Sequence, residues 1–292
     1  MELFFQRIVD GLASGAIYAA IALALVLIYR STSLLNFAQG EMAMFSTFIG
    51  WMFTDAGLPV AVAIVFAMAI SFVGGAAIER FLIRPVGQDN LLAIVIVTIG
   101  IFLAVNALAG WVYGTDGRTF PSAFPNESWD VGGVAIRFEL LGNLAVLFGV
   151  VGILYLIFQK TKVGLAMRAV SNNMESSSLV GIRTSRMLML GWGMAAALGA
   201  LAGCLVAPVL TLELNMMGGV LIYGFAAATL GGFDSPLGAV VGGLTVGVVQ
   251  ALAGGYIGVF DRVELASAFL LILIVLLVKP AGLFGKMEVQ RV

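Results

Sequence analysis

Residues 160–186 read KTKVGLAMRAVSNNMESSSLVGIRTSR, a polar and basic stretch between two hydrophobic runs that are each long enough to cross a bilayer. Four apolar residues recur in it at spacings of four, three and four, which places them on one face of a helix. They are Val163, Met167, Val170 and Met174. The stretch therefore predicts a short amphipathic helix that an otherwise buried protein presents to water.

The opposite face of this predicted helix, over residues 163–180, carries Arg168, Asn172 and Glu175, and Gly181 is a natural stop. An amphipathic helix of this kind is suited to lie in a groove on a partner protein. The alternative is an ordinary connecting loop.

The composition places the chain in a membrane. Of 292 residues, 61% are hydrophobic and 11% are charged, against roughly 25% charged in an ordinary soluble domain. A net charge of −1 gives no sign of a nucleic-acid partner. With no histidine and one cysteine, Cys204, there is no disulfide framework and no Cys/His metal site. We expect an all-α, polytopic helix bundle in contact with lipid, formed as a single transmembrane domain over residues 1–292.

A membrane span needs about 20 mostly apolar residues, and the sequence offers about eight or nine candidates, some of them broken or re-entrant. The candidates are residues 8–29, 34–53, 58–78, 91–113, 140–158 and 187–212, followed by the shorter pieces 218–230, 237–253 and 265–278.

The distribution of Lys and Arg predicts the orientation. With the N-terminus outside and the C-terminus cytosolic, the cytosolic side receives Arg30, Arg80, Arg84, Lys160, Lys162, Arg168, Arg183, Arg186, Lys279, Lys286 and Arg291. Only Arg7, Arg118, Arg137 and Arg262 then lie outside. Residues 160–186 are therefore predicted to be a cytosolic loop, and residues 114–139 a long external loop.

Two hydrophobic segments are interrupted, at residues 36–41 (NFAQGE) and 231–238 (GGFDSPLG). Broken helices are tolerated in membranes where the backbone lines a cavity or is buried in protein, and paired breaks can mark a transport path. The alternative is a pair of ordinary interfacial turns. The polar candidates for such a path are Asn36, Gln39, Glu41, Thr98, Asn106, Asp234 and Gln250.

Small residues recur at every fourth position, a pattern that lets helix backbones approach closely in lipid. One ridge holds Gly191, Ala195, Gly199 and Gly203, and shorter ones hold Gly11 with Gly15 and Gly243 with Gly247. We expect these residues to pack helices rather than to touch a solute.

The sequence lacks the motifs of an autonomous motor or enzyme. It has no Gly-x-x-x-x-Gly-Lys-Ser/Thr nucleotide loop, no His-Glu-x-x-His zinc site and no Gly-x-Ser-x-Gly nucleophile elbow, so we expect no catalytic residue and no cofactor on this chain. Its spans hold few charges for ion coupling. A permease driven by a partner fits best. The alternatives are a passive channel for urea or small amides, an ion-coupled secondary carrier and, least of all, a membrane enzyme.

The spacing from Glu175 to Gly181 resembles the Glu-Ala-Ala-x-x-x-Gly signature of ABC importer permeases, whose coupling helix docks on an ATPase. Ser176 and Ser177 stand where that signature has alanines, and its Ile-x-Leu-Pro tail is missing. The resemblance implies an ATPase-coupling role for Val163, Met167, Arg168, Val170, Met174, Glu175 and Gly181.

The chain also resembles the LivH-type permeases of branched-chain amino acid ABC importers. The motifs that carry this resemblance are residues 11–20 (GLASGAIYAA), 29–44 (YRSTSLLNFAQGEMAM), Arg84-Pro85, 164–181, 230–239 (LGGFDSPLGA) and 279–285 (KPAGLFG). It implies a multi-pass subunit in the bacterial inner membrane that imports branched-chain or related amino acids. It also implies four kinds of partner: a second related permease, two cytosolic ABC ATPases that carry ATP and Mg, an extracytoplasmic solute-binding protein and membrane lipid.

Overall fold

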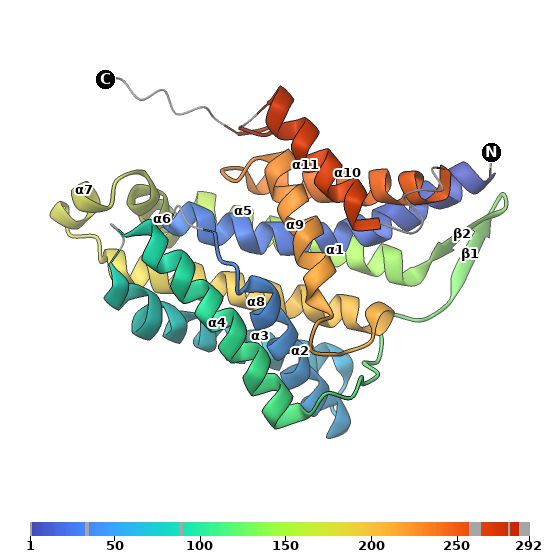
Figure 1. Ribbon diagram of the computed structural model, residues 1–292, viewed down its shortest axis with the longest axis horizontal. Coiled ribbons are helices and arrows are strands. Elements are labelled where there is room, and N and C mark those ends of the chain that lie inside the picture. The colour runs from blue at the N-terminus through green and yellow to red at the C-terminus, as the bar shows by residue number, and fades with distance from the viewer. Residues whose placement is uncertain (1, 33–34, 88–89, 257–263, 280, 286–292) are drawn as a thin grey trace. The chain divides into compact units, whose positions relative to one another are not determined.

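The computed structural model describes residues 2–32, 35–87, 90–256, 264–279 and 281–285 (Figure 1). The chain forms two compact units, each assembled from separate segments. The first unit holds residues 1–26, 124–147 and 219–292, and the second holds residues 27–123 and 148–218. Helices α1 (Glu2–Thr32) and α5 (Phe138–Lys160) contribute to both units.

The second unit is built around three helices that pack on one another, α2 (Gln39–Asp55), α3 (Val60–Ile78) and α8 (Thr184–Leu210). Helix α4 (Leu91–Tyr113) packs beside α2, and a π-helical turn, η1 (Glu79–Ile83), continues α3. A 3-10 turn, η2 (Arg84–Val86), follows η1. The same unit contains two short helices, α6 (Lys162–Asn172) and α7 (Met174–Leu179).

Glycines set the separation of α2 and α8. A β-carbon at Gly199 would lie 2.6 Å from the side-chain nitrogen of Gln39, and one at Gly203 would overlap the hydroxyl of Thr47. Since any larger side chain would push the helices apart, the predicted packing role of this small-residue ridge is confirmed.

The first unit contains α9 (Met217–Gly231), α10 (Pro236–Tyr256) and α11 (Glu264–Val278) beside the N-terminal part of α1. The two short glycine ridges predicted from the sequence meet each other here. A β-carbon at Gly15 would lie 2.8 Å from the Cα of Leu244, and one at Gly247 would overlap the backbone of Gly11. Helices α1 and α10 therefore cross at backbone contact.

Six helices are long and apolar enough to cross a membrane, counted over the described ranges. They include α1, α3 to α5, α8 and α10, whereas α2, α9 and α11 have only 17, 15 and 15 residues. The helical bundle is as predicted, but the predicted span over residues 34–53 is helical only from Gln39. The count of about eight or nine spans and the orientation stay predictions, and Arg262, Lys286 and Arg291, which entered the charge count, lie outside the described residues.

Within the predicted external loop lies a β-hairpin that the sequence did not reveal. Its strands are β1 (Ser128–Val131) and β2 (Val134–Arg137), paired antiparallel with Val131 opposite Val134. Gly132 and Gly133 both have positive φ, at 64° and 84°, which is the geometry of a tight two-residue hairpin turn. A Gly-Gly pair of this kind is a hairpin signal, although the strands on either side are only four residues long.

We predict that Gly247→Ala will lower the melting temperature of the detergent-purified protein. The added methyl group meets the backbone of Gly11 and Gly15, and overpacking of this kind costs about 1–3 kcal/mol. The matched control is Gly254→Ala on the same helix, where a β-carbon meets nothing within 4 Å. Because alanine favours a helix over glycine by about 1 kcal/mol, the control should be neutral or stabilising. Equal melting temperatures for the two variants would contradict the close crossing.

Candidate functional site

Residues 160–186 form two helices rather than one. Helix α6 begins after Thr161, whose hydroxyl accepts a hydrogen bond from the backbone N–H of Gly164 at 3.1 Å. Asn173 then adopts an extended backbone conformation, and its side chain accepts a bond from the N–H of Ser176 at 2.7 Å. The prediction of a single helix over residues 163–180 is therefore wrong, because a side-chain cap at Asn173 starts a second helix.

The apolar stripe of α6 faces the protein itself. Met167 and Val170 are buried, and α6 packs against α8. Gly164 lies so close to the end of α5 that a β-carbon there would overlap the backbone of Phe158. The stripe thus attaches α6 to its own chain and leaves Met167 and Val170 unavailable to a partner, while Met174 is half-buried and Val163 is exposed.

Two large apolar residues stay exposed at the end of α7. Leu179 and Val180 have exposed fractions of 83% and 77%, and Glu175 in the first turn of α7 is also exposed. Gly181 follows with a φ of 86°, so the predicted helix stop at this glycine is confirmed. These two residues form an exposed apolar tip at the end of α7, whose other exposed residues are polar.

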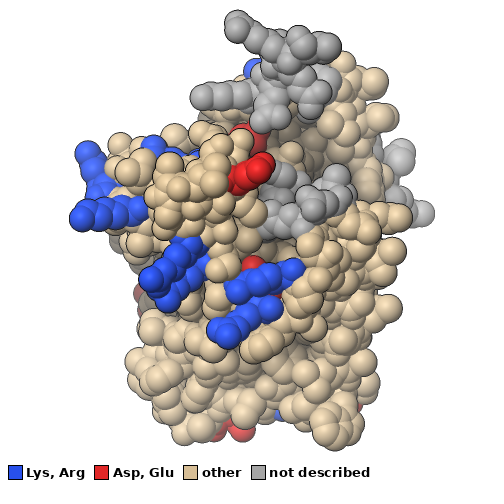
Figure 2. Space-filling model, turned by 90° about the vertical axis from the view of Figure 1, so that its left-hand side faces the viewer, with Lys and Arg blue, Asp and Glu red and all other residues tan. Residues whose placement is uncertain are grey.

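The segment that carries this tip is rich in basic side chains. Figure 2 shows Lys and Arg gathered on the face that contains α6, α7 and the start of α8. Within residues 160–186 they are Lys160, Lys162, Arg168, Arg183 and Arg186. The guanidinium of Arg168 donates to the side-chain oxygen of Gln159 at 3.2 Å, which holds it against the end of α5.

The structure adds an ion pair that sequence reasoning missed. Arg84 contacts the carboxylate of Glu79 with two nitrogens, at 2.6 and 3.3 Å, and its Nη2 also donates to the carbonyl of Ser185 at 3.0 Å. The Glu79 side chain is only 1% exposed. The pair therefore links the end of α3 to the start of α8, where residues 160–186 end.

The π-helical turn explains why this pair was missed. Side chains five residues apart do not face each other on an α-helix, where neighbours are three or four residues apart. In η1 the N–H of Arg84 instead bonds the carbonyl of Glu79, and the wider turn brings the two side chains together. The same residues line a cavity of about 180 Å³ together with Ile83, Gly87, Met174, Thr184, Ser185 and Leu188.

Four of the predicted path residues form a polar cluster of two hydrogen-bonded pairs where α2 begins, in which Asn36, Gln39 and Glu41 are buried and Asn106 is half-buried. The amide of Asn106 on α4 donates to the carboxylate of Glu41 at 3.0 Å and to the carbonyl of Leu214 at 3.3 Å. Asn36 donates to the side-chain oxygen of Gln39 at 3.2 Å, and Gln39 donates to the carbonyl of Ala195 on α8 at 3.0 Å. Glu41 is 4% exposed, so this carboxylate is held inside the helix bundle.

The other three predicted path residues have different surroundings. The hydroxyl of Thr98 donates to the carbonyl of Val95 in its own helix. In the first unit, Gln250 accepts a hydrogen bond from the hydroxyl of Tyr18 at 2.7 Å, and Asp234 is exposed in the break between α9 and α10.

The break between α9 and α10 is completed by the C-terminal segment. The N–H groups of Leu283 and Phe284 donate to the carbonyls of Leu230 and Gly231 at 2.7 and 3.1 Å. These carbonyls belong to the last turn of α9, which has no helical partner for them. Residues 283 and 284 thus donate hydrogen bonds to backbone carbonyls that lipid hydrocarbon cannot satisfy. This contact explains why the motif at residues 279–285 accompanies the distant motif at residues 230–239.

Among the described residues, there is no group of three or more Asp, Glu or Cys side chains placed to hold a metal ion. Long apolar helices, interrupted helices and a buried polar cluster define the class of multi-pass helical membrane proteins.

The comparisons with known proteins identify the family. The chain belongs to the family described as branched-chain amino acid transport system / permease component, which matches residues 7–278. It is 30% identical to the high-affinity branched-chain amino acid transport system permease protein LivH of Escherichia coli K12, over 99% of this chain and 98% of that one. It is 29% identical to the corresponding permease protein BraD of Pseudomonas aeruginosa, over the same shares.

A comparison with solved structures matches the chain to one of low sequence identity. It is PsaBC from Streptococcus pneumoniae in complex with Fab, with a TM-score of 0.47 and 15% identity over 96% of this chain and 93% of that one.

We predict that Arg84→Gln will destabilise the protein more than Glu79→Gln/Arg84→Gln. The single change leaves a buried carboxylate without its cation, which costs about 3–5 kcal/mol for a fully buried pair. Because the Arg84 side chain is 36% exposed, we expect about 1–3 kcal/mol, measured by chemical denaturation of the purified protein. Arg80→Gln, which removes an exposed neighbouring charge, is the control. Equal stability of the single and double variants would show that the ion pair does not hold Glu79.

Proposed function

We propose that this chain is a membrane-spanning subunit of an ABC importer for branched-chain or related amino acids in a bacterial cytoplasmic membrane. It works with a second related permease, two cytosolic ATPases that bind ATP and Mg, and an extracytoplasmic solute-binding protein. The observation that carries the proposal is the family membership over nearly the whole chain. In this proposal the two units act as a single permease domain, with the N-terminus outside and residues 160–186 in the cytosol.

The exposed tip of α7 is the proposed contact with an ATPase. Leu179 and Val180 offer an apolar anchor, and the basic residues around it offer a charged rim, which is the composition of a protein interface. Glu175 places a negative charge in the first turn of α7, and Gly181 ends the helix. The buried residues Met167 and Val170 do not contact the ATPase in this proposal. They fix α6 to α8, so that a movement imposed by the ATPase is transmitted to the helix bundle.

Arg84 provides a second connection for the same movement. Its bonds to Ser185 and Glu79 join the start of α8 to the end of α3. A displacement of α7 by an ATPase would therefore move α3 and α8 together, since these helices also pack along their lengths. Coupling of this kind needs a contiguous set of packed elements between the two sites.

We predict that Val180→Asp will abolish solute-stimulated ATP hydrolysis in the assembled complex while the protein remains inserted. Docking would bury the carboxylate introduced at position 180, which opposes binding of the apolar tip. Removal of an anchor residue from an interface typically costs 2 kcal/mol or more, roughly a thirtyfold loss of affinity. The measurement is phosphate release by the two permeases and the two ATPases, reconstituted in liposomes together with the solute-binding protein.

The matched control is Val131→Asp, which changes another exposed valine, 59% exposed, on the predicted external hairpin. Normal hydrolysis and uptake by Val180→Asp would refute the docking assignment. Uptake by this chain alone without ATP would instead favour a passive channel, and uptake that follows a proton or sodium gradient would favour a secondary carrier.

We further propose that the cluster of Asn36, Gln39, Glu41 and Asn106 borders the translocation path. Glu41 is a buried carboxylate, Asn36 and Gln39 are buried amides and Asn106 is half-buried. Polar and ionisable groups inside a helix bundle mark such a path in many transporters, since their burial has a cost that packing alone does not require. Thr98, Asp234 and Gln250 are the further residues proposed for this path.

We predict that Asn106→Cys will react with a charged thiol reagent in the assembled transporter, and that leucine supplied with its binding protein will slow the reaction. The native Cys204 is buried and provides an unreactive background. Leu103→Cys in the middle of the same helix, 62% exposed where lipid is expected, is the control and should not react. An Asn106→Cys variant that stays unmodified with and without nucleotide would remove Asn106 from the path.

A further inference from the structure

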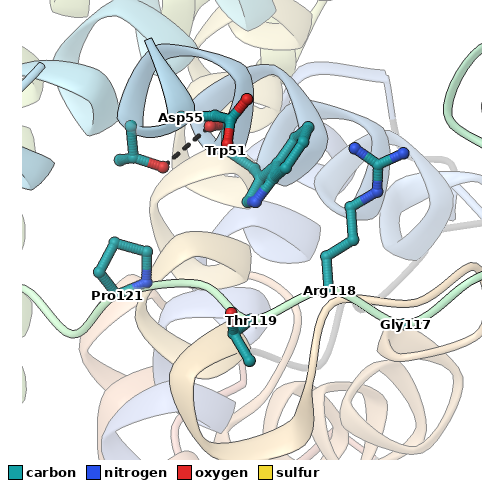
Figure 3. Close-up of a pocket in the computed structure, with 7 residues that line it drawn as sticks. Trp51, Asp55, Gly117, Arg118, Thr119 and Pro121 are labelled. Carbon is teal, nitrogen blue, oxygen red and sulfur yellow. Dashed lines mark hydrogen bonds between the residues drawn. The ribbon is translucent and has the colours of Figure 1, made fainter. Parts of the chain in front are cut away.

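A second polar site lies at the opposite end of α2 from the buried cluster. It is a pocket of about 490 Å³ between the last turns of α2 and residues 117–121 of the predicted external loop (Figure 3). Its lining residues are Trp51, Thr54, Asp55, Gly117, Arg118, Thr119 and Pro121. No role in the proposed ATPase coupling or in the buried path accounts for it.

The loop wall of this pocket is fixed to the bundle. Arg118 exchanges two backbone hydrogen bonds with Leu212, each 2.9 Å long. Phe120, two residues further on, is buried, and a β-carbon at Gly50 of α2 would lie 3.6 Å from its ring. Because both flanks of Thr119 are anchored, the wall has a defined shape before any ligand binds, which lowers the entropic cost of binding.

The cationic group of the pocket is stacked on an aromatic ring. The guanidinium carbon of Arg118 lies 4.0 Å from the centre of the Trp51 ring. Asp55 is four residues after Trp51 and therefore shares its face of α2. Figure 3 shows Arg118 reaching the indole from the loop, while Trp51 and Asp55 come from the helix.

Arg118 retains hydrogen-bonding capacity in this position. Its Nη2 donates to the carbonyl of Tyr113 at 2.5 Å, and a guanidinium carries five N–H donors in all. The Trp51 ring and the Tyr113 carbonyl thus orient the guanidinium, whose remaining donors match the two oxygens of a carboxylate.

We propose that this pocket is a receiving site for a zwitterionic α-amino acid on its way to the buried path. Arg118 binds the α-carboxylate, Asp55 binds the α-ammonium group and Trp51 contacts the aliphatic side chain. One cation and one anion give the pocket no net charge, which suits a zwitterion better than an organic anion or an amine. The site rests on the proposed function, and it lies about 21 Å along α2 from Glu41.

The test compares leucine with two analogues that each lack one of its charges. We would measure equilibrium binding to the reconstituted assembly of two permeases and two ATPases, without the binding protein. The ligands are leucine, 4-methylpentanoate (no ammonium group) and 3-methylbutylamine (no carboxylate). Asp55→Asn should weaken leucine binding about tenfold or more and leave 4-methylpentanoate unchanged. Arg118→Gln should weaken leucine binding similarly and leave 3-methylbutylamine unchanged.

Glu127→Gln and Arg137→Gln, two exposed charge changes elsewhere in the predicted external loop, are the controls. Because Arg118 also bonds the backbone of Tyr113, Asp55→Asn is the variant that separates recognition from folding. The proposal is overturned if leucine does not bind the wild-type complex, or if both variants bind and import leucine normally while ATP-driven uptake persists. It is also overturned if the variants lose only stimulation by the binding protein, since the pocket would then be a protein contact. Failure of ATP-driven uptake in the wild type would instead refute the proposed function.

Discussion

Close approach of helix backbones is the constraint on which the rest of this structure depends. In lipid, apolar side chains gain little by leaving hydrocarbon, so helices associate through packing and hydrogen bonds. Gly199 and Gly203 let α2 approach α8 until the amide of Gln39 reaches the carbonyl of Ala195. The small residues therefore do more than fill space, because they hold the start of α2 deep in the bundle and with it the carboxylate of Glu41.

Interrupted helices are the second consequence of the membrane environment. Each break exposes backbone groups that need a partner, and the protein supplies those partners either locally or from a distant part of the chain. The side chain of Asn36 accepts a bond from the N–H of Ala38 at the first break, and residues 283 and 284 bond the carbonyls at the second. Because polar groups must gather at these places, the breaks are also where a polar solute can be accommodated.

The segment proposed to lie in the cytosol and to couple to an ATPase is attached to the bundle by two sets of contacts. The buried stripe of α6 packs on α8, and the bonds of Arg84 join the start of α8 to η1. The residues that look most like a docking face in the sequence, Met167 and Val170, are used for this attachment. The apolar residues proposed to contact a partner, Leu179 and Val180, follow the stripe rather than belong to it.

Local patterns in the sequence were sufficient for the helical bundle, the helix end at Gly181, the role of the small residues and the family resemblance. Each follows from hydrophobic length, from the left-handed conformation that glycine adopts easily, or from a motif contiguous in the chain. The sequence could not show that the ridge at Gly11 and Gly15 meets the ridge at Gly243 and Gly247, nor that Asn106 pairs with Glu41. Those contacts join residues far apart in the chain, and many pairings satisfy the same local pattern. Tertiary packing selected among them, because it brings glycine backbones face to face and gives the buried carboxylates of Glu41 and Glu79 their donors.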